Sequence, residues 1–464
     1  MGENTGTAET NDTNDSTNDN SLQSKNSYKL YPWRFTVTTG VFLAGGAGNI
    51  VFATYGSVTP TTAVRYNTSQ TVINNLTLYY TAAFLIFSYP CMWLLDKKGL
   101  RVAMFAVALV NIVASLIRWL SFAAAEEYHL ALLHVGHILG GIVSPITISA
   151  PTMTAAAWFS GNGRLTANTV MTLAGPLGSA LVAGVAPLVV SSDDPTTVDT
   201  WNLVIFIIAL VFGLTALLVY DKPLTPPSPS EDKKSTMPIT FRESITQIWK
   251  NKPFWILLTV FSCLIAILNM TSTIISSFVV PYGYTEDDSG NLAVAAIAAG
   301  LIGSIIVAMV LDRTKKHKLA LKFSAFLSFL GFAVFTFAAM DPSRIIVAYI
   351  AAAVFGLGAV PCMSLAMELG VECTYPIGEE VSTGFLWSFA QLFTMVLLVL
   401  SNFTRDGDGK MGVLLIVVSV VLFLVFFVSL LFANKNRRMA IEGVASEMTV
   451  SDELNPEDLK IQSA

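Results

Sequence analysis

Charge is scarce in this sequence. Only 13% of the 464 residues are Asp, Glu, Lys or Arg, whereas 53% are hydrophobic; an average soluble domain carries roughly 25% charged residues. The missing charge indicates an apolar solvent, so we expect a protein that lies mostly in a lipid bilayer. The formal net charge of -5 says little about partners because much of the acid sits in polar terminal segments. No basic footprint of nucleic-acid binding is visible.

Cysteine and enzyme motifs are also scarce. The chain has four cysteines, all within or at the ends of apolar runs: Cys91, Cys263, Cys362 and Cys373. Their spacing suits neither a zinc site nor a disulfide framework, so we expect packing residues, with no metal and no cofactor. The sequence has no Walker loop, nucleophile elbow or hydrolase-type pair of carboxylates, which argues against an enzyme.

Long apolar runs, in contrast, are abundant. A bilayer-spanning helix needs about 20 mostly apolar residues, and windows of that length predict twelve spans: 33-57, 77-95, 102-124, 129-158, 164-190, 201-220, 254-280, 290-311, 319-339, 345-370, 380-402 and 411-433. A proline-rich polar segment divides them into two sets of six. We therefore expect an all-α membrane protein with twelve transmembrane helices in two six-helix pseudo-repeats. The expected parts are a disordered tail (1-32), a first bundle (33-220), a linker (221-253), a second bundle (254-433) and a tail (434-464).

Lys and Arg gather in alternate loops, which predicts the orientation because these residues are retained on the cytoplasmic side. The basic loops follow the second, sixth and eighth spans, so the linker and both termini should be cytoplasmic. Asn67, in an Asn-Thr-Ser glycosylation pattern, would then face outward. No sorting signal distinguishes a plasma membrane from a lysosome- or vacuole-type membrane, and we expect a monomer that binds a small molecule.

A charged turn occurs twice, each time after the second span of its half. The first copy contains Asp96, Lys97 and Arg101, and the second contains Asp312 and Arg313. Such residues can be mere loop charge, but an acidic residue adds little to topology, so the repeat favours a gate. An Asp at a helix end that pairs across the seam between the halves can lock one side in one state and release it in another.

Two six-span halves that share this turn resemble the major facilitator superfamily, whose halves are parallel repeats around a central pathway. Three segments are similar, more narrowly, to solute carrier family 49, which includes the feline leukaemia virus subgroup C receptor-related and disrupted-in-renal-carcinoma type proteins. They are Met92-Trp93-Leu94-Leu95-Asp96-Lys97-Lys98-Gly99-Leu100-Arg101, Ala150-Pro151 to Trp158-Phe159, and Glu368 to Pro376 with Gln391. The resemblance implies a major facilitator fold and transport of a small organic solute by alternating access.

The resemblance also implies a range of solutes, because choline, ethanolamine, haem and pyridoxine are associated with members of the family. Transport could be downhill, as in a uniporter, or proton-coupled. A receptor or sensor that keeps the transporter fold without transporting is the alternative, although the short polar tails offer no signalling domain.

The choline carriers of this family have a Trp in span one, a Tyr in span seven and glutamines in spans five and eleven. The matching positions here are Phe52, Asn269, Pro176 and Gln391. The aromatic cage that holds a quaternary ammonium is thus incomplete, although Tyr55, one turn after Phe52, could supply part of it. The resemblance therefore predicts a substrate site at Phe52, Tyr55, Asn269 and Gln391, while Phe52 is equally consistent with ordinary packing.

Ionisable residues within the spans are candidates for function because a charge is costly to place in a bilayer. Glu368 and Glu372, four apart on one helix face, could couple transport to protons or could instead bond backbone amides. His134 and His137 could shuttle protons or bind haem iron, but a pair of packing histidines is the simpler interpretation. Arg118 lies near the outer end of its span, where we expect it to extend to the interface.

Overall fold

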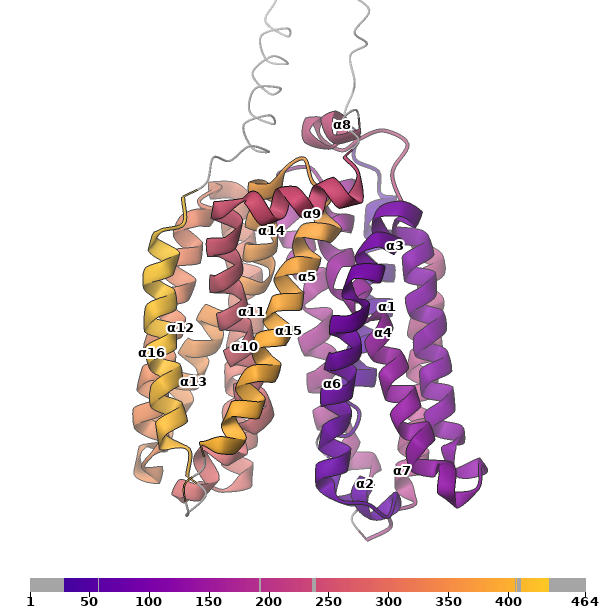
Figure 1. Ribbon diagram of the computed structural model, residues 1–464, viewed down its shortest axis with the longest axis vertical. Helices are drawn as coiled ribbons and strands as arrows, with labels where there is room; N and C mark the ends of the chain where they lie inside the picture. Colours follow the sequence, from indigo (N-terminus) through magenta and orange to yellow (C-terminus); the bar gives the residue numbers. More distant parts are fainter. Residues whose placement is uncertain are drawn as a thin grey trace, which may run out of the picture.

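Two helical bundles lie side by side in the structure, a computed structural model that describes residues 29–433 except 57, 192, 236–238, 405 and 407–409 (Figure 1). The first bundle consists of α1 (Trp33–Ala53), α2 (Thr59–Arg65), α3 (Gln70–Trp119), α4 (Glu126–Trp158), α5 (Arg164–Thr172), α6 (Ala174–Val189) and α7 (Thr197–Leu214). The second consists of α10 (Lys252–Val279), α11 (Glu286–Thr314), α12 (His317–Ala339), α13 (Ile345–Ala359), α14 (Cys362–Thr374), α15 (Glu379–Phe403) and α16 (Gly412–Leu430). Apart from residues 29–32, the two expected tails lie outside the described residues.

Two short helices between the bundles, α8 (Pro229–Ser235) and α9 (Phe241–Lys250), lie across one end of the molecule, at the top of Figure 1. We call this the linker end, and we call the opposite end, where α2 lies, the distal end. The first turn of α9 is fixed by a capping box, in which Thr240 and Glu243 exchange hydrogen bonds with each other's backbone amides. Hydrogen bonds from the Thr240 backbone N–H and then from its side chain lower the pKa of the exposed Glu243 carboxyl.

Eleven helices within the described residues are long and apolar enough to cross a membrane. One of them, Asn75–Ala123, has 49 residues, and at about 1.5 Å per residue it is far longer than a hydrocarbon core of about 30 Å. It contains the predicted span 77-95 and all but the last residue of 102-124. Between these spans lies Gly99, where φ is 82° and the backbone leaves the helical region. The all-α membrane fold is thus confirmed, whereas the number twelve stays a prediction.

Two runs that we expected to be single helices are broken. The predicted span 164-190 is divided into α5 and α6 at Leu173, and 345-370 is divided into α13 and α14 beside Pro361. Pro361 stands at the N-cap of α14, where its missing N–H costs no intrahelical hydrogen bond. Hydropathy predicted the apolar runs correctly but carried no information on these interruptions.

The bundles share part of their hydrophobic core. The core of the second bundle takes in four buried residues of the first: Phe84, Met92, Leu165 and Leu173. α15 and α3 approach closely, because a Cβ atom at Gly384 would lie 2.2 Å from the sulfur of Met92. This contact holds the two bundles together in the half of the molecule nearer the linker end.

Candidate functional site

The second copy of the charged turn links the two bundles. The carboxylate of Asp312, at the end of α11, accepts hydrogen bonds from the backbone N–H groups of Leu165 (3.1 Å) and Thr166 (2.8 Å). It also accepts one from the Thr166 hydroxyl (2.6 Å). The first N–H groups of a helix lack intrahelical partners and favour negative charge, so Asp312 stabilises the start of α5 from the other bundle. Its side chain is buried, whereas Arg313 is exposed.

The first copy of the turn is arranged differently. Asp96 forms an ion pair with its neighbour Lys97 (3.0 Å), and the backbone N–H of Arg101 donates to Asp221 (2.8 Å). The Arg101 guanidinium lies over the ring of Tyr220, 5.1 Å from its centroid. All these partners belong to the first half of the chain, and within the described residues the Asp96 carboxylate makes no hydrogen bond to the second bundle.

A buried ion pair forms a second link between the bundles. Arg164, the first residue of α5, places Nη1 4.0 Å from Oε1 of Glu368 on α14, and its Nη2 donates to the Ser228 hydroxyl (3.2 Å). Both members of the pair are almost fully buried, and so is Glu372 one turn later on α14. Arg164 was not among the residues that the sequence singled out. A basic residue in the first turn of a helix opposes the helix dipole, and that anomaly was the available signal.

Hydroxyl pairs also join the bundles along this seam. The Thr169 hydroxyl donates to Ser364 (2.7 Å), and the Ser388 hydroxyl donates to Ser88 (3.0 Å). Each pair joins a helix of one bundle to a helix of the other. The hydrogen bonds and the ion pair that join the bundles in the described part of the chain therefore lie toward the linker end, which is closed.

Three of the expected substrate residues remain partly exposed. The Asn269 amide on α10 donates to the Thr394 hydroxyl on α15 at 3.5 Å, and Thr394 is one turn beyond Gln391. Asn269 and Gln391 are thus neighbours on facing helices of the second bundle. Phe52 belongs to the first bundle, where its ring packs on Tyr80 with centroids 4.9 Å apart.

Tyr55, the fourth of these residues, lies inside the first bundle. Its side chain is 3% exposed, and its hydroxyl donates to Oδ1 of Asn202 at 2.6 Å. The Asn202 amide in turn donates to the Tyr66 hydroxyl (3.3 Å), and burial raises the pKa of Tyr66. Tyr55 therefore lies in the core of the first bundle as part of a hydrogen-bonded network.

Arg118 does not extend to the interface, contrary to our expectation. Its side chain is 1% exposed, and Nη1 donates to the Val51 carbonyl and the Thr54 hydroxyl, both at 3.2 Å. The guanidinium fits because Gly136 faces it: a Cβ atom there would lie 2.5 Å from Cγ of Arg118. An Arg near the end of a membrane helix can extend to the interface only if its face of the helix is free. The face of α3 that carries Arg118 is packed on α1 and α4.

The two histidines of α4 have different surroundings. His137 is buried, with Nδ1 3.5 Å from the Arg118 guanidinium. His134 is half-buried, and its Nδ1 lies 2.7 Å from the Leu130 carbonyl oxygen. In the described ranges, no group of three or more His, Cys, Asp or Glu residues is placed to hold a metal ion.

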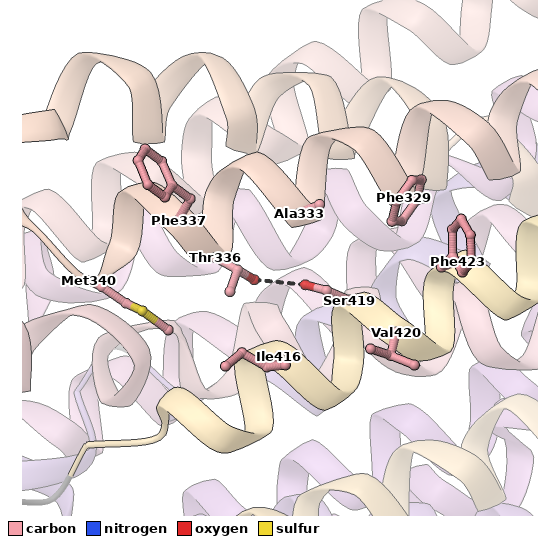
Figure 2. A pocket seen from close by; sticks show the side chains of 9 residues that line it. All are labelled: Phe329, Ala333, Thr336, Phe337, Met340, Ile416, Ser419, Val420 and Phe423. Carbon is pink, nitrogen blue, oxygen red and sulfur yellow. Dashed lines mark hydrogen bonds between the residues drawn. The ribbon is translucent and has the colours of Figure 1, made fainter.

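A hollow of about 400 Å³ lies between α12 and α16, as Figure 2 shows. Its walls are apolar side chains such as Phe329, Met340 and Phe423, and its two hydroxyls, Thr336 and Ser419, bond each other at 2.9 Å. It offers no charged group and belongs to one bundle alone. Its chemistry suits lipid chains better than a polar solute that must pass between the bundles.

Comparison with known proteins gives consistent results. The sequence model of the Major Facilitator Superfamily matches residues 37–378. The chain is 26% identical to solute carrier family 49 member A3 of Danio rerio over 377 residues, which cover 80% of this chain and 79% of that protein. It is 27% identical to the choline/ethanolamine transporter FLVCR1 of Felis catus over 398 residues, covering 82% and 69% of the two chains.

Among solved structures, the fucose:proton symporter FucP of E. coli superposes with a TM-score of 0.67 at 12% identity, covering 87% of this chain and 98% of that one. This likeness concerns the fold alone. The sequence relatives confirm the narrower resemblance to solute carrier family 49 that the motifs predicted.

Proposed function

The chain belongs to the major facilitator superfamily, and from that premise we propose that it carries a small organic solute across a membrane by alternating access. The observation that carries this proposal is the one-sided seam. Asp312, the Arg164–Glu368 pair and the hydroxyl pairs join the bundles toward the linker end, while Phe52, Asn269 and Gln391 keep partial exposure farther from it. A carrier that is closed on one side has this asymmetry.

The proposed solute site lies between Phe52 of the first bundle and the Asn269 and Gln391 pair of the second. Two amides and one aromatic face suit a small polar molecule that is held by hydrogen bonds and ring contact. Tyr55 supports the site indirectly, because its bond to Asn202 fixes the turn that follows Phe52. Relatives are named choline/ethanolamine transporters, so these amines belong among the solutes to examine, together with pyridoxine and haem.

The proposed gate at the linker end consists of Asp312 and its partners on α5. Asp96, Lys97, Arg101 and Arg313 are candidates for the same gate in another state, when the turn of the first bundle meets different neighbours. The positive-inside rule supports a cytoplasmic linker end. Asn67 is exposed beside α2 at the distal end, which suits an outward-facing glycosylation site.

The test is an uptake screen in proteoliposomes with purified full-length protein, using choline, ethanolamine, pyridoxine and haem. We expect one of these classes to accumulate and Gln391→Ala to reduce its uptake at least tenfold. Leu392→Ala is the matched control, because Leu392 is the next residue of α15 and points outward, 43% exposed. Unchanged uptake in both Gln391→Ala and Phe52→Ala would show that the pocket is elsewhere, and absence of uptake or counterflow would favour a sensor.

A further inference from the structure

Arg118 is a buried cation whose visible partners are all neutral. Its guanidinium contacts the Val51 carbonyl and the hydroxyls of Thr54 and Ser115, at 3.2 to 3.3 Å, and His137 at 3.5 Å. Its Nε atom has no hydrogen-bond partner in the part of the chain that the structure describes. Since Arg does not lose its proton in proteins, the positive charge persists inside the bundle.

Among the described residues, no carboxylate forms an ion pair with Arg118, and Glu126 and Glu127 at the start of α4 are exposed. The sequence has no Asp or Glu in α1, none between Asp96 and Glu126, and none between Glu127 and Asp193. Asp199 stands at the distal end of α7, but it forms its own ion pair with Arg65 at 2.7 Å. An unpaired charge away from water is costly to keep, and its field is weakly screened because little water surrounds it.

A continuous set of contacts leads from Arg118 to the proposed solute site. The carbonyl that Arg118 binds belongs to Val51, the residue before Phe52. The Phe52 ring packs on Tyr80, and the Tyr80 ring lies 5.8 Å from that of His137, which contacts Arg118. Three buried polar atoms near these residues have no hydrogen-bond partner within the described residues: Nε2 of His137 and both side-chain amide atoms of Asn111.

We infer that Arg118 makes the pathway beside Phe52 electropositive, so that the solute bound there is neutral, zwitterionic or anionic and a quaternary ammonium ion is disfavoured. This inference rests on the proposed solute site. The incomplete aromatic cage points the same way, because Phe52 alone offers a cation little compensation for the repulsion. The selection is one of charge, whatever the shape of the solute.

The test measures local potential without knowledge of the solute. Phe52→Cys provides a thiol, and its modification rates by cationic trimethylammonioethyl and anionic sulfonatoethyl methanethiosulfonate are each divided by the rate for a free thiol in solution. The full chain without the added cysteine is the control for background, since Cys91, Cys263, Cys362 and Cys373 are all buried. We expect the anionic reagent to be favoured and Arg118→Gln to reduce that preference.

The expected size follows from Coulomb's law. A unit charge ~10 Å away, at an effective dielectric constant between ~20 and ~80, changes the rate of each reagent by ~2- to ~17-fold. The ratio of anionic to cationic rates should therefore fall at least ~4-fold in Arg118→Gln, whereas Arg118→Lys should preserve most of it. If Arg118→Gln does not fold, Gln391→Cys in the intact protein serves instead, and its ratio should be lower than that at Phe52→Cys.

The outcomes separate the two ideas. If neither reagent modifies Phe52→Cys, the residue does not face an aqueous pathway, and the proposed site is wrong together with the inference. If both reagents react but the ratio is the same with and without Arg118, or the same at Phe52→Cys and Gln391→Cys, the site stands and the electropositive pathway is refuted.

Discussion

Removal of the Asp312 carboxylate should open the linker end. In the structure this carboxylate accepts three hydrogen bonds from the first turn of α5, and a hydrogen bond to a charged group contributes about 1.5–3 kcal/mol. Water replaces part of these bonds when the ends separate, so we expect Asp312→Ala to shift the equilibrium between closed and open forms by ~2–3 kcal/mol in total. That shift is a ~30- to ~160-fold change in the ratio of open to closed molecules.

The open fraction can be measured with a cysteine at a buried position of the seam. Thr169 is 1% exposed, so Thr169→Cys should react with a maleimide only when the linker end opens, and its rate should rise in proportion to the open fraction. Thr314→Ala in the same background is the matched control, because Thr314 is an exposed residue at the end of the same helix as Asp312. Asp312→Asn, which keeps the shape and loses the charge, should give an intermediate rate. Equal rates in Asp312→Ala and Thr314→Ala would refute the reasoning.

Three further variants test the seam and the solute site. Gly384→Val should also accelerate the Thr169→Cys reaction, because even a Cβ atom at Gly384 would lie 2.2 Å from the Met92 sulfur. Gly290→Val should not accelerate it, because open space surrounds Gly290. Equal Thr169→Cys rates in these two variants would contradict the prediction. Glu368→Gln should lower uptake, because the ion pair with Arg164 makes Glu368 a link between the bundles. Any response of uptake to a pH gradient should remain. If the variant lost only that response, Glu368 would be a proton site instead. Tyr55→Phe should lower the thermal midpoint, since it leaves the buried Asn202 oxygen without its donor at a cost of ~1–3 kcal/mol, and any rise in KM for the solute should accompany that loss of stability. A higher KM at unchanged stability would place Tyr55 in the solute site.

The spans could be predicted because their physical cause is local. A helix that crosses a bilayer needs an uninterrupted apolar run, and the predicted spans 254-280 and 319-339 agree closely with α10 (Lys252–Val279) and α12 (His317–Ala339). The interruptions at Leu173 and beside Pro361 were missed because hydropathy averages over a window. A prolyl ring and a change of backbone direction have almost no weight in such an average.

The contacts of the site depend on tertiary packing, which the sequence conceals. The importance of Asp312 could be inferred from the repeat of the charged turn, but its partners could not. They lie on α5, 147 and 146 residues away in the chain. They are backbone N–H groups, which every residue except proline possesses. The burial of Arg118 was not predicted for a related reason. Its burial depends on Gly136 of a neighbouring helix, and a single sequence does not tell which glycine faces which side chain.

The two copies of the charged turn contribute unequally to the contact between the bundles, and the difference has a physical basis. Asp312 stands at a helix end that meets the first turn of a helix of the other bundle, so its charge is matched by free N–H groups. Asp96 lies one turn beyond Met92, which contacts Gly384 of α15. The first turn of α15 carries Glu379 and Glu380, and these carboxylates oppose the same kind of capping. The first copy therefore pairs with Lys97, and closure of the linker end depends mainly on the second copy, which makes Asp312 the more sensitive of the two positions.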